Sequence, residues 1–100
     1  MFELVKSSAF DAWLRSLHDL RAKARTAARL DRVADGNFGD VKVVGGGVSE
    51  LRIDYGPGYR VYFMRRGSVL VVVLAGGDKR TQHRDIETAK RIAIEWEQRP

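Results

Sequence analysis

The chain of 100 residues has no cysteine, two prolines and two histidines. Without cysteine it can form no disulfide, no thiolate metal site and no cysteine nucleophile. The two histidines, His18 and His83, do not form a zinc-site pattern with the carboxylates. We therefore expect no metal ion and no other cofactor.

Long apolar runs are absent as well. The longest, Val69 to Ala75, is far too short to span a membrane, and the N-terminus lacks a charged-then-apolar signal pattern. We therefore expect a cytoplasmic protein with no membrane partner. The composition is 44% hydrophobic and 31% charged, which is typical of a globular protein, and the length predicts a single domain over residues 1–100.

Basic residues outnumber acidic ones, giving a formal net charge of +5. Residues 1–50 hold eight Lys and Arg against seven Asp and Glu, whereas residues 51–100 hold ten against six. The second half is therefore expected to face an acidic partner, either nucleic acid or an acidic protein segment. The alternative is a basic surface that is merely solvated.

Apolar residues at helical spacing predict three helices. The first helix is marked by Phe10, Trp13, Leu14 and Leu17. The second extends from about Leu20 to Ala34 with Asp19 as its cap. Its expected apolar stripe consists of Leu17, Leu20, Ala24, Ala27, Leu30 and Ala34. The last follows Thr81 as a cap, and its stripe consists of Ile86, Ala89, Ala93 and Trp96.

Between the second and last helices the apolar period changes to two, which predicts strands. Residues 50–55 and 59–64 form a hairpin around the turn Gly56-Pro57-Gly58. Val69 to Ala75 predicts a strand covered on both faces, after which Gly76-Gly77-Asp78 is expected to loosen the chain. With an edge strand over Met1–Val5, the fold class is α+β: two N-terminal helices and a C-terminal helix on a mainly antiparallel sheet, in the order β-α-α-β-β-β-α. The sequence leaves open whether a further short strand covers Val41 to Val44.

The hairpin places Arg52, Arg60 and Tyr62 on its polar face, where they alternate with apolar residues. Two arginines and a tyrosine on an open sheet face can hold a phosphate and stack on a base. The equally weighted alternative is that these residues only pair across the strands with Glu50 and Asp54.

A second polar cluster covers residues 78–85, where the apolar strand gives way to the last helix. The backbone N–H groups of a helix start attract anions. The cluster adds the side chains of Lys79, Arg80, His83 and Arg84. The alternative is a solvated helix cap, and for His83 alone that alternative is favoured.

Three stretches of the chain resemble a known family. They are Gly36 to Lys42, Val48 to Tyr62, and Gly76-Gly77-Asp78-Lys79 followed by Gln82 and Asp85-Ile86. Together they resemble the phage-derived, HigB-type addiction-module killer proteins of the RelE/ParE toxin superfamily. The likeness covers nearly the whole chain and keeps the order of elements.

The resemblance implies a RelE/ParE-like α+β toxin, neutralised by a cognate antitoxin that is a HigA-like helix-turn-helix protein. It also implies cleavage of mRNA on the ribosome, by attack of the ribose 2′-OH on the adjacent phosphate. We expect the catalytic residues to be Arg52, Arg60, Lys79 and His83. The RNA-binding residues are expected to be Lys42, Tyr62, Arg80, Gln82 and Arg84.

Two other functions stay open. ParE-type relatives inhibit DNA gyrase without nuclease activity, and no feature of the sequence excludes that function. An inactive relative that only binds its antitoxin is the second alternative. The general base, the codon preference and the antitoxin-binding surface are not determined by the sequence.

Overall fold

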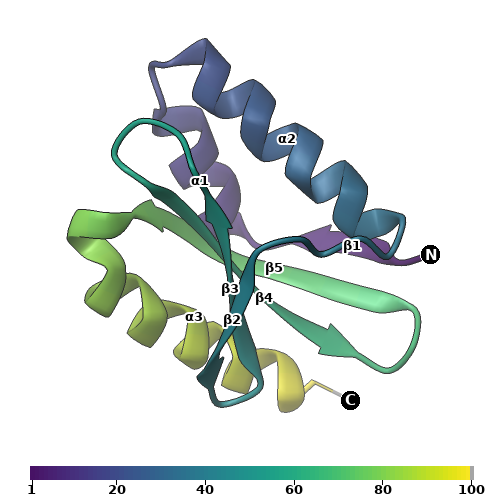
Figure 1. The fold of residues 1–100 in the computed structure, drawn as a ribbon. Coiled ribbons are helices and arrows are strands. Elements are labelled where there is room, and N and C mark those ends of the chain that lie inside the picture. Colours follow the sequence, from purple (N-terminus) through teal and green to yellow (C-terminus); the bar gives the residue numbers. More distant parts are fainter. Residues whose placement is uncertain (100) are drawn as a thin grey trace.

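The computed structural model describes residues 1–99 as helices packed on one sheet (Figure 1). The elements are β1 (Glu3–Lys6), α1 (Ser8–Ser16), α2 (Leu20–Ala34), β2 (Val41–Gly45), β3 (Val48–Ile53), β4 (Tyr59–Arg66), β5 (Leu70–Asp78), the 3-10 helix η1 (Lys79–Thr81) and α3 (Gln82–Glu97). The predicted order is confirmed, and the strand left open at Val41 to Val44 is present as β2. Within residues 1–99, no helix is long and apolar enough to cross a membrane.

The five strands form one sheet in the order β1-β5-β4-β3-β2. β1 lies at one edge and pairs with β5 in parallel, whereas the other three pairings are antiparallel. Figure 1 shows α1 and α2 against one face of the sheet and α3 against the other. The predicted α+β class, with a mainly antiparallel sheet, is therefore confirmed.

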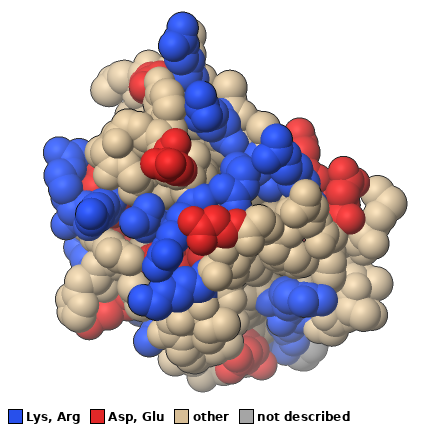
Figure 2. All heavy atoms as spheres, viewed as in Figure 1, with Lys and Arg blue, Asp and Glu red and all other residues tan. Residues whose placement is uncertain are grey.

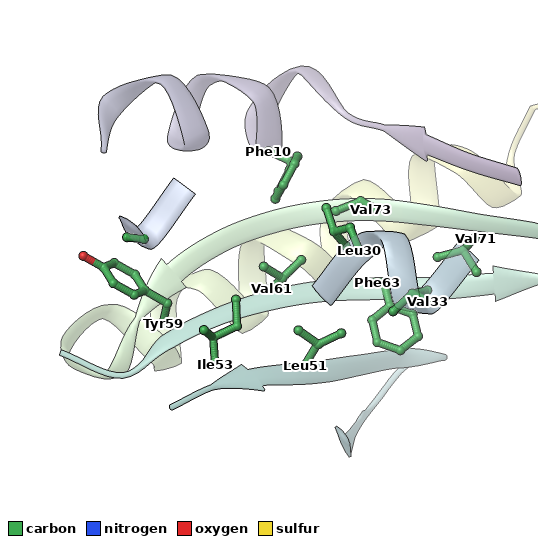
Figure 3. Packing of buried hydrophobic residues seen from close by; sticks show 11 residues of the cluster. Phe10, Leu30, Val33, Leu51, Ile53, Tyr59, Val61, Phe63, Val71 and Val73 are labelled. Atoms are coloured by element: carbon green, nitrogen blue, oxygen red, sulfur yellow. The ribbon is translucent and has the colours of Figure 1, made fainter. Parts of the chain in front are cut away.

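Each face of the sheet has its own hydrophobic core. The larger core lies under α1 and α2, where Phe10 and Leu30 meet alternate residues of the strands (Figure 3). Its strand residues are Leu51, Ile53, Tyr59, Val61, Phe63, Val71 and Val73. The smaller core lies under α3 around Ala89 and Ala93, as the predicted stripe of that helix requires. Because side chains alternate along a strand, the polar face of the β3–β4 hairpin is the face that α3 partly covers.

The buried side of α2 differs from the predicted stripe. Asp19 caps the helix as expected, accepting from the backbone N–H groups of Arg21 and Ala22. However, Leu20 is 76% exposed, and the buried residues are Ala22, Thr26, Leu30 and Val33. Thr26 can lie in the core because its hydroxyl donates to the Ala22 carbonyl at 2.9 Å. The expected stripe was chosen from apolar residues alone, so it differs in part from the side of the helix that is buried.

Gly76 and Gly77 do not loosen the chain but belong to β5. A Cβ on Gly76 would lie 2.2 Å from the Trp13 ring, and one on Gly77 would lie 1.8 Å from the Asp85 carboxylate. The two glycines therefore admit a ring from α1 on one face and a carboxylate from α3 on the other. The expected Thr81 cap is also revised: Asp78 caps η1, and the Thr81 hydroxyl donates to Asp85.

We expect Gly76→Ala to destabilise the protein by about 1–3 kcal/mol, because the added methyl group overlaps the Trp13 ring. Urea unfolding of Gly76→Ala alone and in a Trp13→Ala background measures this. The cost of the added methyl should fall clearly once the ring is removed. An equal cost in both backgrounds would show that the ring is not the obstacle.

Candidate functional site

The candidate site is built around Glu50 of β3, whose side chain is 0% exposed. Its Oε2 accepts from the Gln82 amide at 2.7 Å and from the Tyr62 hydroxyl at 3.1 Å. Its Oε1 accepts from Arg52 Nε at 3.2 Å and lies 3.7 Å from Arg60 Nε. The carboxylate thus joins β3, β4 and the start of α3.

Strand register explains why these side chains meet. Glu50 lies directly opposite Tyr62, and Arg52 lies directly opposite Arg60. Residues two apart on a strand share a face, so all four point to the same side of the hairpin. The prediction that Arg52, Arg60 and Tyr62 share one face is therefore confirmed. Gln82, the first residue of α3, reaches the same carboxylate from above the sheet.

Two opposing influences act on the Glu50 carboxyl. Burial by itself raises its pKa, because a charge is poorly solvated inside the protein. Hydrogen bonds from Gln82, Arg52 and Tyr62, with the charge of Arg60, outweigh burial, so the pKa lies below its ordinary value. Burial and the nearby Glu50 charge raise the pKa of the Tyr62 phenol. Glu50 is therefore a carboxylate at neutral pH, and Tyr62 is a neutral hydrogen-bond donor.

An open pocket of about 370 Å³ lies at the end of the hairpin beside this network. Arg52, Arg60 and Lys79 bring cationic groups to its wall, and Asp40 and Asp54 bring carboxylates. The turn contributes Gly58, whose positive φ of 82° is readily adopted by glycine and brings the chain back into β4. The pocket therefore combines positive charge with groups that can accept a proton.

The two arginines differ in how they are held. The Arg52 side chain is 35% exposed and is bonded through Nε, so its terminal nitrogens can face the pocket. The Arg60 side chain is 14% exposed. Among residues 1–99, its guanidinium makes one hydrogen bond, a 3.4 Å contact from Nη1 to the Tyr59 carbonyl, and its buried Nε has no acceptor. Arg60 therefore keeps donors that a ligand could use.

Tyr62 does not offer the open stacking surface that was expected of it, and Gln82, expected to bind RNA, contacts Glu50 instead. Tyr62 is 0% exposed beneath α3, so the expectation of an open sheet face is wrong at this position. The ring packs in the core, and only its hydroxyl takes part in the network. Gln82 is half-buried, and its side-chain amide donates to Glu50. In this structure both residues donate to Glu50, the carboxylate that lies beside the arginines.

The other expected residues lie outside the pocket wall. His83 is 96% exposed on α3 and its Nε2 lies 3.6 Å from Glu87. Arg80 pairs with Asp78 at 2.9 Å, and Arg84 Nε lies 4.0 Å from Asp85. Lys42 is exposed on β2, directly across from Glu50 in the strand register. Of the nine expected residues, the pocket therefore brings together Arg52, Arg60 and Lys79.

Sequence reasoning gave Glu50 no functional role, treating it as an ordinary cross-strand partner. It also left Asp40 and Asp54 out of the site. One signal for Glu50 was present in the sequence. It shares the polar face of the hairpin with Arg52 and Arg60, and it follows the apolar Val48 on that face. Within residues 1–99, no group of three or more His, Asp or Glu side chains is placed to hold a metal ion.

We expect Glu50→Gln to lower stability at pH 7 by about 2–4 kcal/mol, because the variant leaves two half-buried arginines without their counter-ion. Since folding lowers the Glu50 pKa, its contribution is present above the unfolded value of about 4.3. That contribution is lost as the pH falls through the lower, folded value. Urea unfolding between neutral and acidic pH should therefore show the difference from wild type shrinking in acid.

The exposed Glu87→Gln variant is the control and should change stability by less than about 0.5 kcal/mol. A Glu50→Gln variant as stable as wild type at neutral pH would contradict the proposed role of the buried carboxylate.

Comparison with known proteins places the chain in a family. A protein of Haemophilus influenzae (strain ATCC 51907 / DSM 11121 / KW20 / Rd), named only as uncharacterized, is 56% identical over 86 residues, which are 86% of this chain and 87% of that protein. The profile of the phage-derived Gp49-like proteins matches residues 12–95, a range that includes the buried glutamate, both arginines and Lys79. The chain therefore belongs to the phage-derived Gp49-like protein family.

Proposed function

We propose that the protein is the toxin of a toxin–antitoxin pair, of the HigB type in the RelE/ParE superfamily, and that it cleaves mRNA on the ribosome. Membership of a phage-derived family supports this proposal, as does the resemblance carried by Val48 to Tyr62. Its expected partners are the mRNA, the ribosome and a cognate helix-turn-helix antitoxin, and its expected setting is the cytoplasm.

The observation that carries the proposal is the convergence of Arg52, Arg60 and Lys79 on one open pocket. Arginine presents a planar fork of donors that matches phosphate oxygens, and Lys79 adds a point charge. Glu50 accepts a hydrogen bond from Arg52 Nε and forms an ion pair with Arg60 at 3.7 Å, which orients both arginines before a ligand arrives. Preorganised donors of this kind stabilise charge that develops on a phosphate during reaction.

The proposed reaction uses the nucleophile that RNA itself carries. The 2′-oxygen attacks the adjacent phosphorus, and the bond from phosphorus to the 5′-oxygen of the next nucleotide breaks. The 2′-OH proton passes to a base, and the departing 5′-oxygen takes up a proton. A 2′,3′-cyclic phosphate and a 5′-hydroxyl result. DNA lacks the 2′-OH and would not react.

The pocket supplies groups suited to each step of this reaction. Arg52 and Arg60 contact the crowded phosphate as its negative charge grows. Asp40 and Asp54 are the carboxylates on the pocket wall that can accept the 2′-OH proton, and the Lys79 ammonium can donate to the 5′-oxygen. Glu50 is a positioning residue, because both of its oxygens are already engaged in the buried network.

We expect expression of the wild type to arrest growth and create new mRNA 5′ ends within minutes. Arg52→Ala and Arg60→Ala should each reduce cleavage by about 10²–10³-fold, since each removes a donor to the reacting phosphate. Sequencing of RNA 5′ ends after induction, normalised to protein level, measures this.

Arg91→Ala is the matched control, because it removes an exposed arginine of α3 that does not line the pocket. Growth arrest without new mRNA ends would overturn the nuclease proposal. Arrest accompanied by DNA damage and gyrase-linked breaks would instead favour gyrase inhibition, and absence of arrest would favour an inactive antitoxin-binding protein.

A further inference from the structure

A row of arginines lies along one side of α2. Arg21, Arg25, Arg29 and Arg32 follow one another at intervals of four, four and three residues, which keeps them on one helical face. At a helical rise of 1.5 Å per residue, neighbours in the row are about 4.5–6 Å apart along the axis. No part of the hairpin pocket is made by this row, so it is a separate feature of the surface.

A shallow groove of about 240 Å³ connects this row to the hairpin. Its wall is formed by Arg25, Ala28, Arg29 and Arg32 from α2, and by Ile53 and Asp54 at the end of β3. Ile53 and Asp54 also line the hairpin pocket, so the two hollows adjoin. Another hollow, formed by Arg21, Ala24, Arg25 and Ala28, continues along the helix. Figure 2 shows Lys and Arg side chains gathered in a band across this face.

Most of this charge is available to a ligand. Arg21, Arg25 and Arg32 are exposed, and within residues 1–99 none of them has a carboxylate within ion-pair distance. Arg25 lies over the Tyr55 ring at 4.7 Å, which orients its guanidinium without neutralising it. The lining of the groove contains three arginines and one carboxylate, that of Asp54.

Arg29 has a different role, which joins the groove to the site. Its Nη1 donates to the carbonyl of Arg52, and its Nη2 donates to the carbonyl of Phe38 at 3.1 Å. Burial lowers the pKa of this guanidinium. The arginine row is therefore attached directly to the backbone of a pocket residue, so the two surfaces hold a constant relative position.

We propose that the α2 groove binds the phosphate backbone of single-stranded RNA as it leaves the hairpin pocket. This inference rests on the proposed function, because the pocket defines where the bound strand begins. A regular row of cations suits a polyanion with regularly spaced charges, and the neighbouring alanines leave room for its backbone. The groove's apolar lining is limited to Ala28 and the buried Ile53, which gives a protein segment little to anchor in.

The test measures binding of a fluorescein-labelled 2′-O-methyl RNA of about 12 nucleotides, a length that suits single-strand grooves. The 2′-O-methyl group removes the nucleophile, so active protein can be used without cleavage. Fluorescence anisotropy over a range of salt concentrations compares wild type, Arg25→Gln/Arg32→Gln, Arg60→Ala and the control Arg15→Gln/Arg91→Gln. Thermal unfolding confirms that each variant is folded.

We expect Arg25→Gln/Arg32→Gln to weaken RNA binding about tenfold or more at low salt. The slope of log affinity against log salt should become shallower by about 1.4, since each lost phosphate contact contributes about 0.7 for a single strand. The control variant, which also loses two exposed arginines, should bind as wild type does.

Unchanged RNA affinity in Arg25→Gln/Arg32→Gln would overturn the inference, as would a wild type that binds no RNA. A different result would assign the groove to a protein partner instead. In that result the variant keeps the RNA affinity of wild type but, unlike wild type, does not bind an acidic polyglutamate peptide. The mRNA-end experiment judges the proposed function separately, because it depends on Arg52 and Arg60 and not on the groove.

Discussion

A single carboxylate inside the protein, that of Glu50, sets the arrangement of the rest of the site. Transferring a charged group from water into a protein costs several kcal/mol unless donors replace the lost hydration. Glu50 meets this requirement with partners from three elements: Arg52 on its own strand, Arg60 and Tyr62 on β4, and Gln82 on α3. These contacts tie the β3–β4 hairpin to the start of the last helix through one buried group.

The same requirement explains how an open pocket can hold fixed arginines. Exposed arginine side chains normally lose considerable freedom when they bind a ligand. Here Nε of Arg52 donates to the buried Glu50 carboxylate, and Nε of Arg60 lies 3.7 Å from it. Both residues also line the pocket. Arg29 adds a second attachment, from α2 to the carbonyl of Arg52. Elements on both faces of the sheet therefore converge on one short segment of β3.

Local patterns predicted the fold well because they depend on neighbours in sequence. The period-two alternation was enough to place Arg52, Arg60 and Tyr62 on one face, and strand register confirms it. The strand residues that α3 covers could not be predicted in the same way. The contact between Gln82 and Glu50, for example, joins residues that are 32 positions apart in the sequence. Tyr62 therefore looked accessible although it is buried, and Glu50 looked like a surface residue.

Other differences between the predicted and the observed structure arose where polar groups or glycines take part in packing. Thr26 lies in the core because its hydroxyl is satisfied within its own helix, which a count of apolar residues cannot detect. The mixed charge of the pocket also required tertiary structure, because Asp40 precedes β2 whereas Lys79 follows β5. Their approach depends on how distant strands are ordered in the sheet.

The adjacent glycines of β5 have a consequence for strand register. Gly76 faces the Trp13 ring and Gly77 faces Asp85, so at this point the strand has no room for a side chain on either face. If β5 slipped by one residue in either direction, Ala75 or Asp78 would move into a space that excludes a Cβ. Steric exclusion thus prevents misaligned pairing of β5 with β4. Since Gly77 lies opposite Arg60, the same exclusion keeps Lys79 in line with the pocket.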